Sequence, residues 1–230
     1  MLKRVLVIFR NEGLLYMFRH SFAYVFQNIL SYETYYLIIM AIKNGGITSK
    51  KQIDFAGELT FRWIESNVQA DEVAREFEDF RSYTTNARQI LDCGGYASCN
   101  YVGKELAGFS WMADTATAMK ALTNLPLYVD FDRKEMYAGY AYTRPKFRRK
   151  GLRYYSLLFK YQNLLKKGLE TERSAIRANN YVSIKANSDR QGHVVYAKAH
   201  YLRFLGFKFW KEVPMNITTK ELADKMNRTS

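Results

Sequence analysis

The sequence has few of the residues that build metal and disulfide sites. Its 230 residues include two cysteines, Cys93 and Cys99, and three histidines. Neither a CxxC nor an HExxH spacing occurs, so the sequence argues against a bound metal. Two cysteines six residues apart could form a disulfide, but two reduced thiols in a reducing cytosol are the interpretation that we favour.

Long hydrophobic runs are also missing. The start of the chain, residues 1–9, holds too short an apolar run for a signal peptide and has no small-residue cleavage site. The apolar region that continues to residue 30 is interrupted by Arg10, Glu12, Arg19 and His20, so it cannot cross a bilayer cheaply. We therefore expect a cytoplasmic protein.

Acidic residues are outnumbered by basic ones. The chain has 35 Lys and Arg residues against 22 Asp and Glu residues, which gives a net charge of +13. Such a charge attracts polyanions, whether nucleic acid, anionic lipid or a phosphorylated cofactor, and does not choose among them. Because no RNP-like, KH-like, helix-turn-helix or zinc pattern occurs, nucleic acid has only the charge in its favour and is an unlikely partner.

The remaining composition is typical of a globular protein. Prolines number only 3, 48% of the residues are hydrophobic, and 16% are aromatic, which favours a well-filled core. The length fits one large domain with an additional N-terminal element. We predict a helix-and-strand extension over residues 1–50, packed on a main domain over residues 51–230.

Residues 11–30 have the periodicity of an amphipathic helix. Apolar side chains recur at steps of three and four, at Leu14, Leu15, Phe18, Phe22, Val25, Phe26, Ile29 and Leu30. We expect this helix to pack on the domain. A basic helix lying on a membrane surface and a partner interface are the alternatives.

Strand and helix patterns alternate along the rest of the chain. Residues 55–92 look mostly helical, and a loop containing Leu125-Pro126 follows the second hairpin strand. Helices are predicted at 151–167 and 181–190, and strands at 35–42, 96–102, 105–112, 135–143, 173–178, 193–203 and 206–213. This order indicates a mixed α/β or α+β domain.

The most informative segment runs from Tyr142 to Tyr154. Six of the ten residues from 144 to 153 are Arg or Lys. A predicted strand leads in, Pro145 ends it, Gly151 permits close backbone approach, and a helix follows. A helix start offers unpaired N–H groups and a positive dipole end, so this order predicts a site for an anion such as a pyrophosphate.

Thr143-Arg-Pro-Lys-Phe-Arg-Arg-Lys-Gly-Leu resembles the pyrophosphate loop of the GNAT superfamily of acyl-CoA N-acyltransferases. That loop usually reads Val-x-Pro-x-Tyr-Arg-x-x-Gly-x-Gly/Ala. Arg148 and Gly151 match its core, Pro145 and Phe147 match the positions before it, and Arg153 departs from its final Gly or Ala. The resemblance is best over residues 85–213.

The resemblance implies a fold, a co-substrate and its contacts. The fold would be α+β, with a central mixed, mostly antiparallel sheet, a splay between two central strands, flanking helices and the N-terminal amphipathic helix. The co-substrate would be acetyl-CoA or another acyl-CoA, with no metal. Its binding residues would be Ala141, Tyr142, Thr143, Arg148, Arg149, Lys150, Gly151, Leu152, Arg153, Tyr154, Asn180 and Ser183.

A second family signature, an Asn that opens a helix after the next strand, fits in two registers. In the one that we prefer, Asn180 opens the helix, Ser183 lies in its first turn, and Arg190-Gln-Gly192-His193 closes it. In the other, Asn187 opens the helix and Leu205-Gly206-Phe207 closes it. The resemblance implies that Asn180 bonds the pantetheine amide and that Ser183 lies near the coenzyme. A helix cap and a first-turn polar residue are the competing interpretations.

The family's usual acid and base do not carry over. Tyr140 stands where the cofactor strand is usually acidic, and Ser188 or Leu202 stands where the family has a tyrosine. Glu135, Tyr140 and Tyr142 are catalytic candidates by location, as is Tyr137, and catalysis by positioning with a water-relayed proton is the alternative.

The expected function is acyl transfer to an amine that is carried by a small molecule or a protein. A CoA-binding protein without activity and a basic protein of nucleic acid or membrane surfaces are the alternatives.

Overall fold

The computed structural model describes residues 30–44, 57–188 and 192–229. The predicted helix at 11–30 lies outside these residues except for Leu30, which is not helical but begins strand β1. The strands are β1 (Leu30–Ala41), β2 (Leu59–Ile64), β3 (Tyr96–Val102), β4 (Glu105–Ala113), β5 (Glu135–Thr143), β6 (Thr171–Arg177), β7 (Val194–Phe204) and β8 (Phe207–Thr218). The α-helices are α2 (Asn67–Ala74), α3 (Ala87–Asp92), α4 (Ala116–Leu122), α5 (Leu152–Lys166), α6 (Tyr181–Ser188) and α7 (Thr219–Thr229). Short 3₁₀ turns are η1 (Ile42–Asn44), η2 (Phe80–Tyr83), η3 (Phe131–Arg133) and η4 (Pro145–Phe147).

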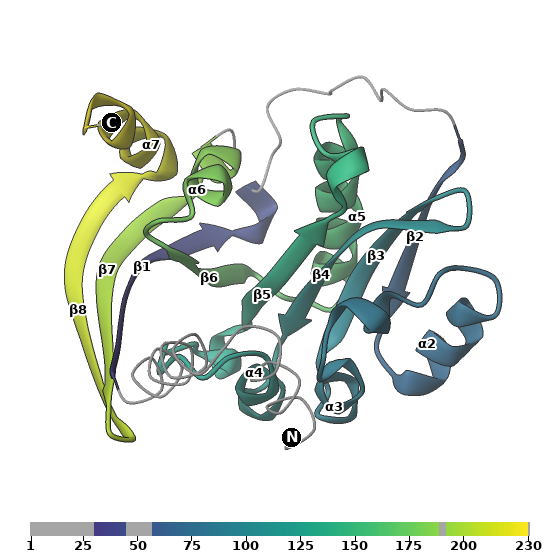
Figure 1. The fold of residues 1–230 in the computed structure, drawn as a ribbon, viewed down its shortest axis with the longest axis horizontal. Helices are drawn as coiled ribbons and strands as arrows, with labels where there is room; N and C mark the ends of the chain where they lie inside the picture. The colour runs from purple at the N-terminus through teal and green to yellow at the C-terminus, as the bar shows by residue number, and fades with distance from the viewer. Residues whose placement is uncertain (1–29, 45–56, 189–191, 230) are drawn as a thin grey trace, which may run out of the picture.

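The eight described strands form one sheet in the order β2-β3-β4-β5-β6-β1-β7-β8 (Figure 1). All neighbours are antiparallel except β5 and β6, which run parallel. The expected mixed, mostly antiparallel sheet is therefore confirmed. Strand β1 does not lie outside the sheet but between β6 and β7, where it pairs with both.

Helices cover both faces of the sheet. Helix α5 packs through Leu157, Tyr161 and Leu164 on Met136 of β5, while α6 and α7 pack on Ile38 of β1 and on the neighbouring strands. Side chains of successive strand residues point to opposite faces, and Met136, Ile38 and Met40 share one face. The other face is covered by η2, α3 and α4, which pack on Trp111 and Tyr137 among others.

Most of the predicted elements are confirmed, with two corrections. The hairpin strands predicted at 96–102 and 105–112, strand β5 and helix α5 lie within a residue of where the pattern placed them. The prediction that residues 55–92 are mostly helical is wrong for Leu59–Ile64, which form the edge strand β2. Helix α4 and helix α7 were not predicted.

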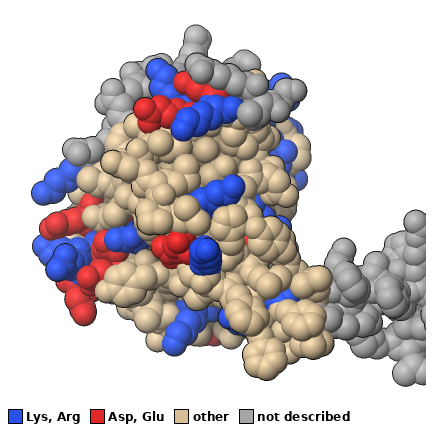
Figure 2. Space-filling view, turned by 90° about the vertical axis from the view of Figure 1, so that its left-hand side faces the viewer, with Lys and Arg blue, Asp and Glu red and all other residues tan. Residues whose placement is uncertain are grey.

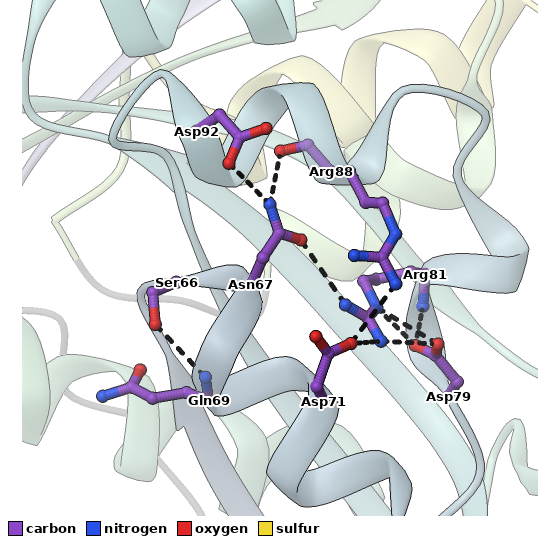
Figure 3. A network of polar contacts seen from close by, with 8 residues as sticks. All are labelled: Ser66, Asn67, Gln69, Asp71, Asp79, Arg81, Arg88 and Asp92. Atoms are coloured by element: carbon purple, nitrogen blue, oxygen red, sulfur yellow. Dashed lines mark hydrogen bonds and ion pairs between the residues drawn. The ribbon is translucent and has the colours of Figure 1, made fainter.

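A polar network around the buried Arg81 holds α2, η2 and α3 together (Figure 3). The Arg81 guanidinium contacts the Asp71 carboxylate at 2.6 Å and the Asp79 carboxylate at 2.9 Å. Asn67 lies beside this network and donates to the Asp92 carboxylate at 2.7 Å and to the Arg88 carbonyl at 3.0 Å. The hydrogen bond from Arg81 lowers the pKa of Asp71. Burial alone would raise the pKa of Asp79, but the hydrogen bonds from Arg81 outweigh burial and lower it.

The substitution Arg81→Met is expected to lower the melting temperature by several degrees, because it leaves both carboxylates without their shared partner. Since the folded pKa values are depressed, this stabilisation is present above the ordinary aspartate pKa of about 4 and is lost as the pH falls through the lower, folded values. Thermal melts recorded at decreasing pH should therefore converge for the wild type and the variant at the acid end. Arg75→Met, at an exposed arginine, is the control. A difference in melting temperature between the wild type and Arg81→Met that stays constant at every pH would contradict the proposed role of the two carboxylates.

Candidate functional site

The central feature of the sheet is the point where β5 and β6 separate. The two strands pair only from Glu135 opposite Thr171 to Ala138 opposite Ser174. Past these four pairs, residues 141–143 of β5 pair with β4 alone among the described strands, and residues 175–177 of β6 pair with β1 alone. The expected splay is therefore present, and its open end lies at the carboxyl ends of both strands, where α5 and α6 begin (Figure 1).

A β-bulge in β5 lies at the start of the open part. Ser110 of β4 pairs with Ala141 and Met112 pairs with Ala138, so Gly139 and Tyr140 both stand opposite Trp111. An extra residue of this kind leaves the ladder and increases the local twist. It also lets Tyr140 and Tyr142 share the α4 face with Tyr137, which a regular strand would not allow.

The strand then leads into the basic loop at residues 144–151. The N–H of Arg144 donates to the Ala107 carbonyl at 3.0 Å, and the buried ring of Phe147 packs with Ala107 and Leu152. Gly108 allows the close approach of β4, because a Cβ atom there would lie 2.6 Å from the Tyr142 carbonyl oxygen. These contacts fix the loop at the end of β5.

Two left-handed residues shape the turn into α5. Arg149 has φ of 62° and Gly151 has φ of 79°, conformations that glycine adopts freely and arginine adopts at a cost. Gly151 precedes α5, and because it has no side chain it supplies no side-chain cap. The first turn of α5 contains no acidic residue. The helix start therefore presents its N–H groups and dipole to an anion.

The basic side chains of the loop fall into two groups. Arg144 contacts the Glu78 carboxylate at 2.8 Å and the Glu105 carboxylate at 2.7 Å, and Lys146 contacts Glu105 at 2.5 Å. Among the described residues, no carboxylate lies within ion-pair distance of three other cations, which are Arg148, Arg149 and Lys150. The first group anchors the loop, and the second leaves it with positive charge.

Arg153 connects the two sides of the open end. Its guanidinium donates from the first turn of α5 to the Asn187 side chain at 3.2 Å. Asn187 is buried in the last turn of α6, where its amide donates to the Ser183 carbonyl at 2.8 Å. The residue that departs from the family pattern therefore joins the helix that follows β5 to the helix that follows β6.

The preferred register of the second signature is supported at its start. The Asn180 side chain accepts from the Ser183 N–H at 3.1 Å, and its carbonyl accepts from the Ile184 N–H at 3.1 Å, so Asn180 caps α6. The alternative register is wrong, because residues 194–204 form strand β7 and Leu205-Gly206 forms the turn to β8. The predicted helix end at 190–193 falls partly outside the described residues.

The closed end of the splay is held by two ion pairs. The Glu135 carboxylate accepts from Arg173 of β6 at 2.8 Å and from the Asp130 N–H at 2.8 Å. Burial raises the pKa of Glu135, but the hydrogen bonds from Arg173 and from the Asp130 N–H outweigh it, and the pKa is lowered. Lys160 of α5 contacts Glu172 of β6 at 2.6 Å, with both side chains 6% exposed.

These contacts place two catalytic candidates away from the open end. Glu135 stands where β5 and β6 are still paired, and its carboxylate is engaged by Arg173. Tyr137 also lies in the paired part and is buried, and burial raises the pKa of its hydroxyl. Neither is carried into the site proposed below.

Tyr140 and Tyr142 lie on the open part of β5, in a row of aromatic rings. The Tyr140 and Tyr142 rings stack at 6.5 Å, and Tyr142 stacks on Tyr83 at 5.7 Å. The Tyr140 side chain stays 53% exposed. Desolvation, followed by the neighbouring Tyr142, raises the pKa of Tyr140, so its hydroxyl keeps its proton at neutral pH.

A polar group on the other side of the splay was not predicted from the sequence. Glu33 accepts from the Tyr35 hydroxyl and contacts Arg177 at 2.9 Å. Burial, followed by Glu33, raises the pKa of Tyr35 to about 12. Arg177 stands opposite Tyr35, past the point where β6 parts from β5. No local signal marks these residues, because β1 and β6 are distant in the sequence.

No family model and no curated protein matches this chain. Several solved structures to which it is similar are GNAT acetyltransferases. A tandem GNAT protein from the clavulanic acid biosynthesis pathway, solved without AcCoA, is 14% identical over 86% of this chain and 59% of its own, with a TM-score of 0.45. A GNAT-family acetyltransferase from Colwellia psychrerythraea is 12% identical over 80% of this chain and 59% of its own, with a TM-score of 0.41.

A Drosophila protein of solved structure is also similar, at 14% identity over 84% of this chain and a TM-score of 0.48. The chain spans 58% of that protein and 59% of the two GNAT structures. These TM-scores are below 0.5, so the similarities carry no argument about what this chain does.

The substitution Lys160→Met is expected to destabilise the fold by about 3 kcal/mol, because it leaves the Glu172 carboxylate buried without its cation. Replacing both partners, as in Lys160→Met with Glu172→Leu, should restore most of that loss, since two apolar side chains of similar size fill the same space. Urea unfolding of the wild type and the two variants measures the effect. A double variant that is less stable than Lys160→Met would contradict this account.

Proposed function

We propose that this chain transfers an acyl group from an acyl-CoA, most simply acetyl-CoA, to an amine. The observation that carries the proposal is the separation of β5 from β6 after Ala138, directly before a basic loop that opens a helix. A long, thin ligand with a diphosphate at one end and a thioester at the other suits that combination. The proposal places the reaction in the cytoplasm.

The diphosphate would be held at the start of α5. The N–H groups of residues 152 and 153 and the helix dipole favour an anion at that point, while the Tyr154 N–H donates to the Gly151 carbonyl. Arg148, Arg149 and Lys150 add charge-assisted contacts, because no described carboxylate neutralises them. Anchoring of the loop through Arg144 and Phe147 keeps these groups in place before the ligand arrives.

The pantetheine arm would lie in the splay. On the side of β5 that faces away from β4, residues 139–143 have no partner strand among the described elements. Backbone N–H and C=O groups on such an edge require partners, and the amide groups of a pantetheine arm are suitable ones. Asn180 and Ser183, at the start of α6, would stand on the opposite side of the same opening.

Acyl-CoA, when bound, supplies an acyl group already activated as a thioester. Tyr140 would donate its proton to the departing sulfur, because the raised pKa of its hydroxyl keeps that proton in place at neutral pH. Tyr142 and Phe109 would orient Tyr140 through ring contacts of 6.5 and 5.8 Å. Positioning of the amine against the thioester would supply the remaining rate acceleration, and the proton of the amine would leave through water.

Binding of CoA tests the phosphate site. Gly151→Val should weaken CoA binding at least about tenfold, because a β-branched residue is strained at a positive φ and its side chain faces the diphosphate. Arg149→Glu should weaken it by a similar factor, since it places a negative charge beside the phosphates. Isothermal titration calorimetry with CoA measures both effects.

Lys104→Glu is the matched control, because this exposed lysine in the β3–β4 turn changes the net charge by the same amount. It should leave CoA binding unchanged. Equal weakening by Lys104→Glu and Arg149→Glu would point to a general charge effect and would count against the site, and so would normal affinity in Gly151→Val.

Turnover tests the role of Tyr140. Tyr140→Phe should lower kcat about a hundredfold and leave the affinity for CoA unchanged, because it removes only the proton donor. The fall in wild-type activity at high pH, where a tyrosine acid loses its proton, should be absent from the variant. Release of the CoA thiol with a panel of amines measures both.

Tyr128→Phe is the control, since Tyr128 is exposed and lies outside the aromatic row. An unchanged kcat in Tyr140→Phe would remove the proposed acid. Tight CoA binding without thiol release from any amine, in the wild type, would instead identify a CoA-binding protein without transferase activity.

A further inference from the structure

An uncovered apolar surface lies at the end of the sheet opposite to α6 and α7. Six side chains form it, and we call it the hairpin face: Leu30, Tyr32, Leu202, Phe204, Phe207 and Phe209. Five of them belong to the exposed large hydrophobic side chains of the molecule, with exposed fractions from 38% for Leu30 to 68% for Phe207. Exposed aromatic side chains gathered in this way mark an interaction surface.

The strand register places all six side chains on one face of the sheet. Leu30 stands opposite Phe204 and Tyr32 opposite Leu202, while Phe204 stands opposite Phe207 and Leu202 opposite Phe209. Residues directly opposite in antiparallel strands point to the same face, as do residues two apart in one strand. The hairpin face is therefore one continuous surface across β1, β7 and β8.

Among the described helices, those that pack on this face of the sheet near the hairpin cover only its other end. Ile38 and Val195, farther along the same strands, are buried under α6 and α7. Toward the β7–β8 turn these helices do not continue, as the lower left of Figure 1 shows. Figure 2 faces the β8 edge and shows uncharged, ring-shaped side chains protruding at the bottom of the molecule, the end at which Figure 1 places that turn.

The charges beside the hairpin face are of one sign. Lys198 and Lys211 lie on the same side of β7 and β8, because Lys211 stands opposite His200, two residues from Lys198. The nearest carboxylates, Glu33 and Glu212, belong to the opposite face, where they stand opposite Tyr201 and Ala199. From β1 residues 30–36, β7 residues 198–204 and β8 residues 207–213, this face receives no acidic side chain.

We propose that the hairpin face docks on an anionic lipid surface. Aromatic and aliphatic side chains at a protruding turn can enter the boundary between headgroups and acyl chains, and lysines next to them attract anionic headgroups. The absence of carboxylates from this face favours such a surface over a second copy of the chain, which would bring lysines against lysines. The proposal goes beyond acyl transfer and does not depend on it.

The sequence that precedes Leu30 also favours an anionic lipid surface. Leu30 belongs to the hairpin face, so the preceding residues join the described fold at this corner. The sequence of residues 11–30 has the amphipathic periodicity that is also typical of a surface-binding helix.

Flotation of the full-length protein with vesicles tests the proposal. The wild type should float with equimolar phosphatidylglycerol and phosphatidylcholine and much less with phosphatidylcholine alone. Phe207→Ser with Phe209→Ser should lower partitioning onto the anionic vesicles at least about tenfold, since two inserted rings are lost. Lys211→Glu should reduce the preference for anionic lipid, and added salt should weaken wild-type binding.

Val68→Ser with Val182→Ser is the matched control, because these valines are 68% and 80% exposed on α2 and α6, away from the hairpin face. It should bind like the wild type, and all variants should keep their melting temperatures. Absence of wild-type flotation, or equal flotation of the two double variants, overturns the proposal. So does a wild-type dimer in size-exclusion chromatography that only the Phe207→Ser, Phe209→Ser protein fails to form, since a second copy would then occupy the face.

Discussion

The rest of this structure depends on one constraint: β5 and β6 must stay paired at one end and separate at the other. A parallel pair held along only four residues on each strand is weak by itself, because its few ladder bonds oppose the entropy of both strands. The Glu135–Arg173 contact and the buried Lys160–Glu172 pair hold the closed end. The Arg153–Asn187 bond connects the helices that follow the two strands, so the separation is fixed on both sides.

The basic loop needs both order and free positive charge, and it meets these two requirements with different side chains. A loop that awaits a diphosphate needs cations, but adjacent cations repel and would loosen it. Glu78 and Glu105 neutralise Arg144 and Lys146, which removes part of the repulsion and ties the loop to β4 and to the segment before η2. Arg148 uses its Nε atom to donate to the Thr143 carbonyl at 2.9 Å, which directs the guanidinium along the loop. The loop is thereby ordered while part of its charge remains available to a ligand.

The parts that could be predicted from the sequence are those that local signals specify. Pro145, the basic run and Gly151 place the end of β5 and the start of α5, and Asn180 marks the start of α6 through its capping chemistry. Strand β2 was missed, because its alternation covers only six residues between helical patterns. The bulge at Gly139–Tyr140 and the contact of Glu33 with Arg177 were not predictable, since each depends on which strands become neighbours. The position of β1 between β6 and β7 is likewise a tertiary outcome.

That position gives β1 a part in both surfaces of interest. Because side chains alternate along a strand, Glu33 and Tyr35 lie on the face of the aromatic row and contact Arg177 beside the open end of the splay. Leu30 and Tyr32 lie on the other face, within the hairpin face. A shift of β1 by one residue would exchange the two sets, placing the Glu33 carboxylate within the apolar hairpin face and moving Tyr35 away from Arg177. The register of one strand therefore determines the far side of the splay and the proposed membrane surface together.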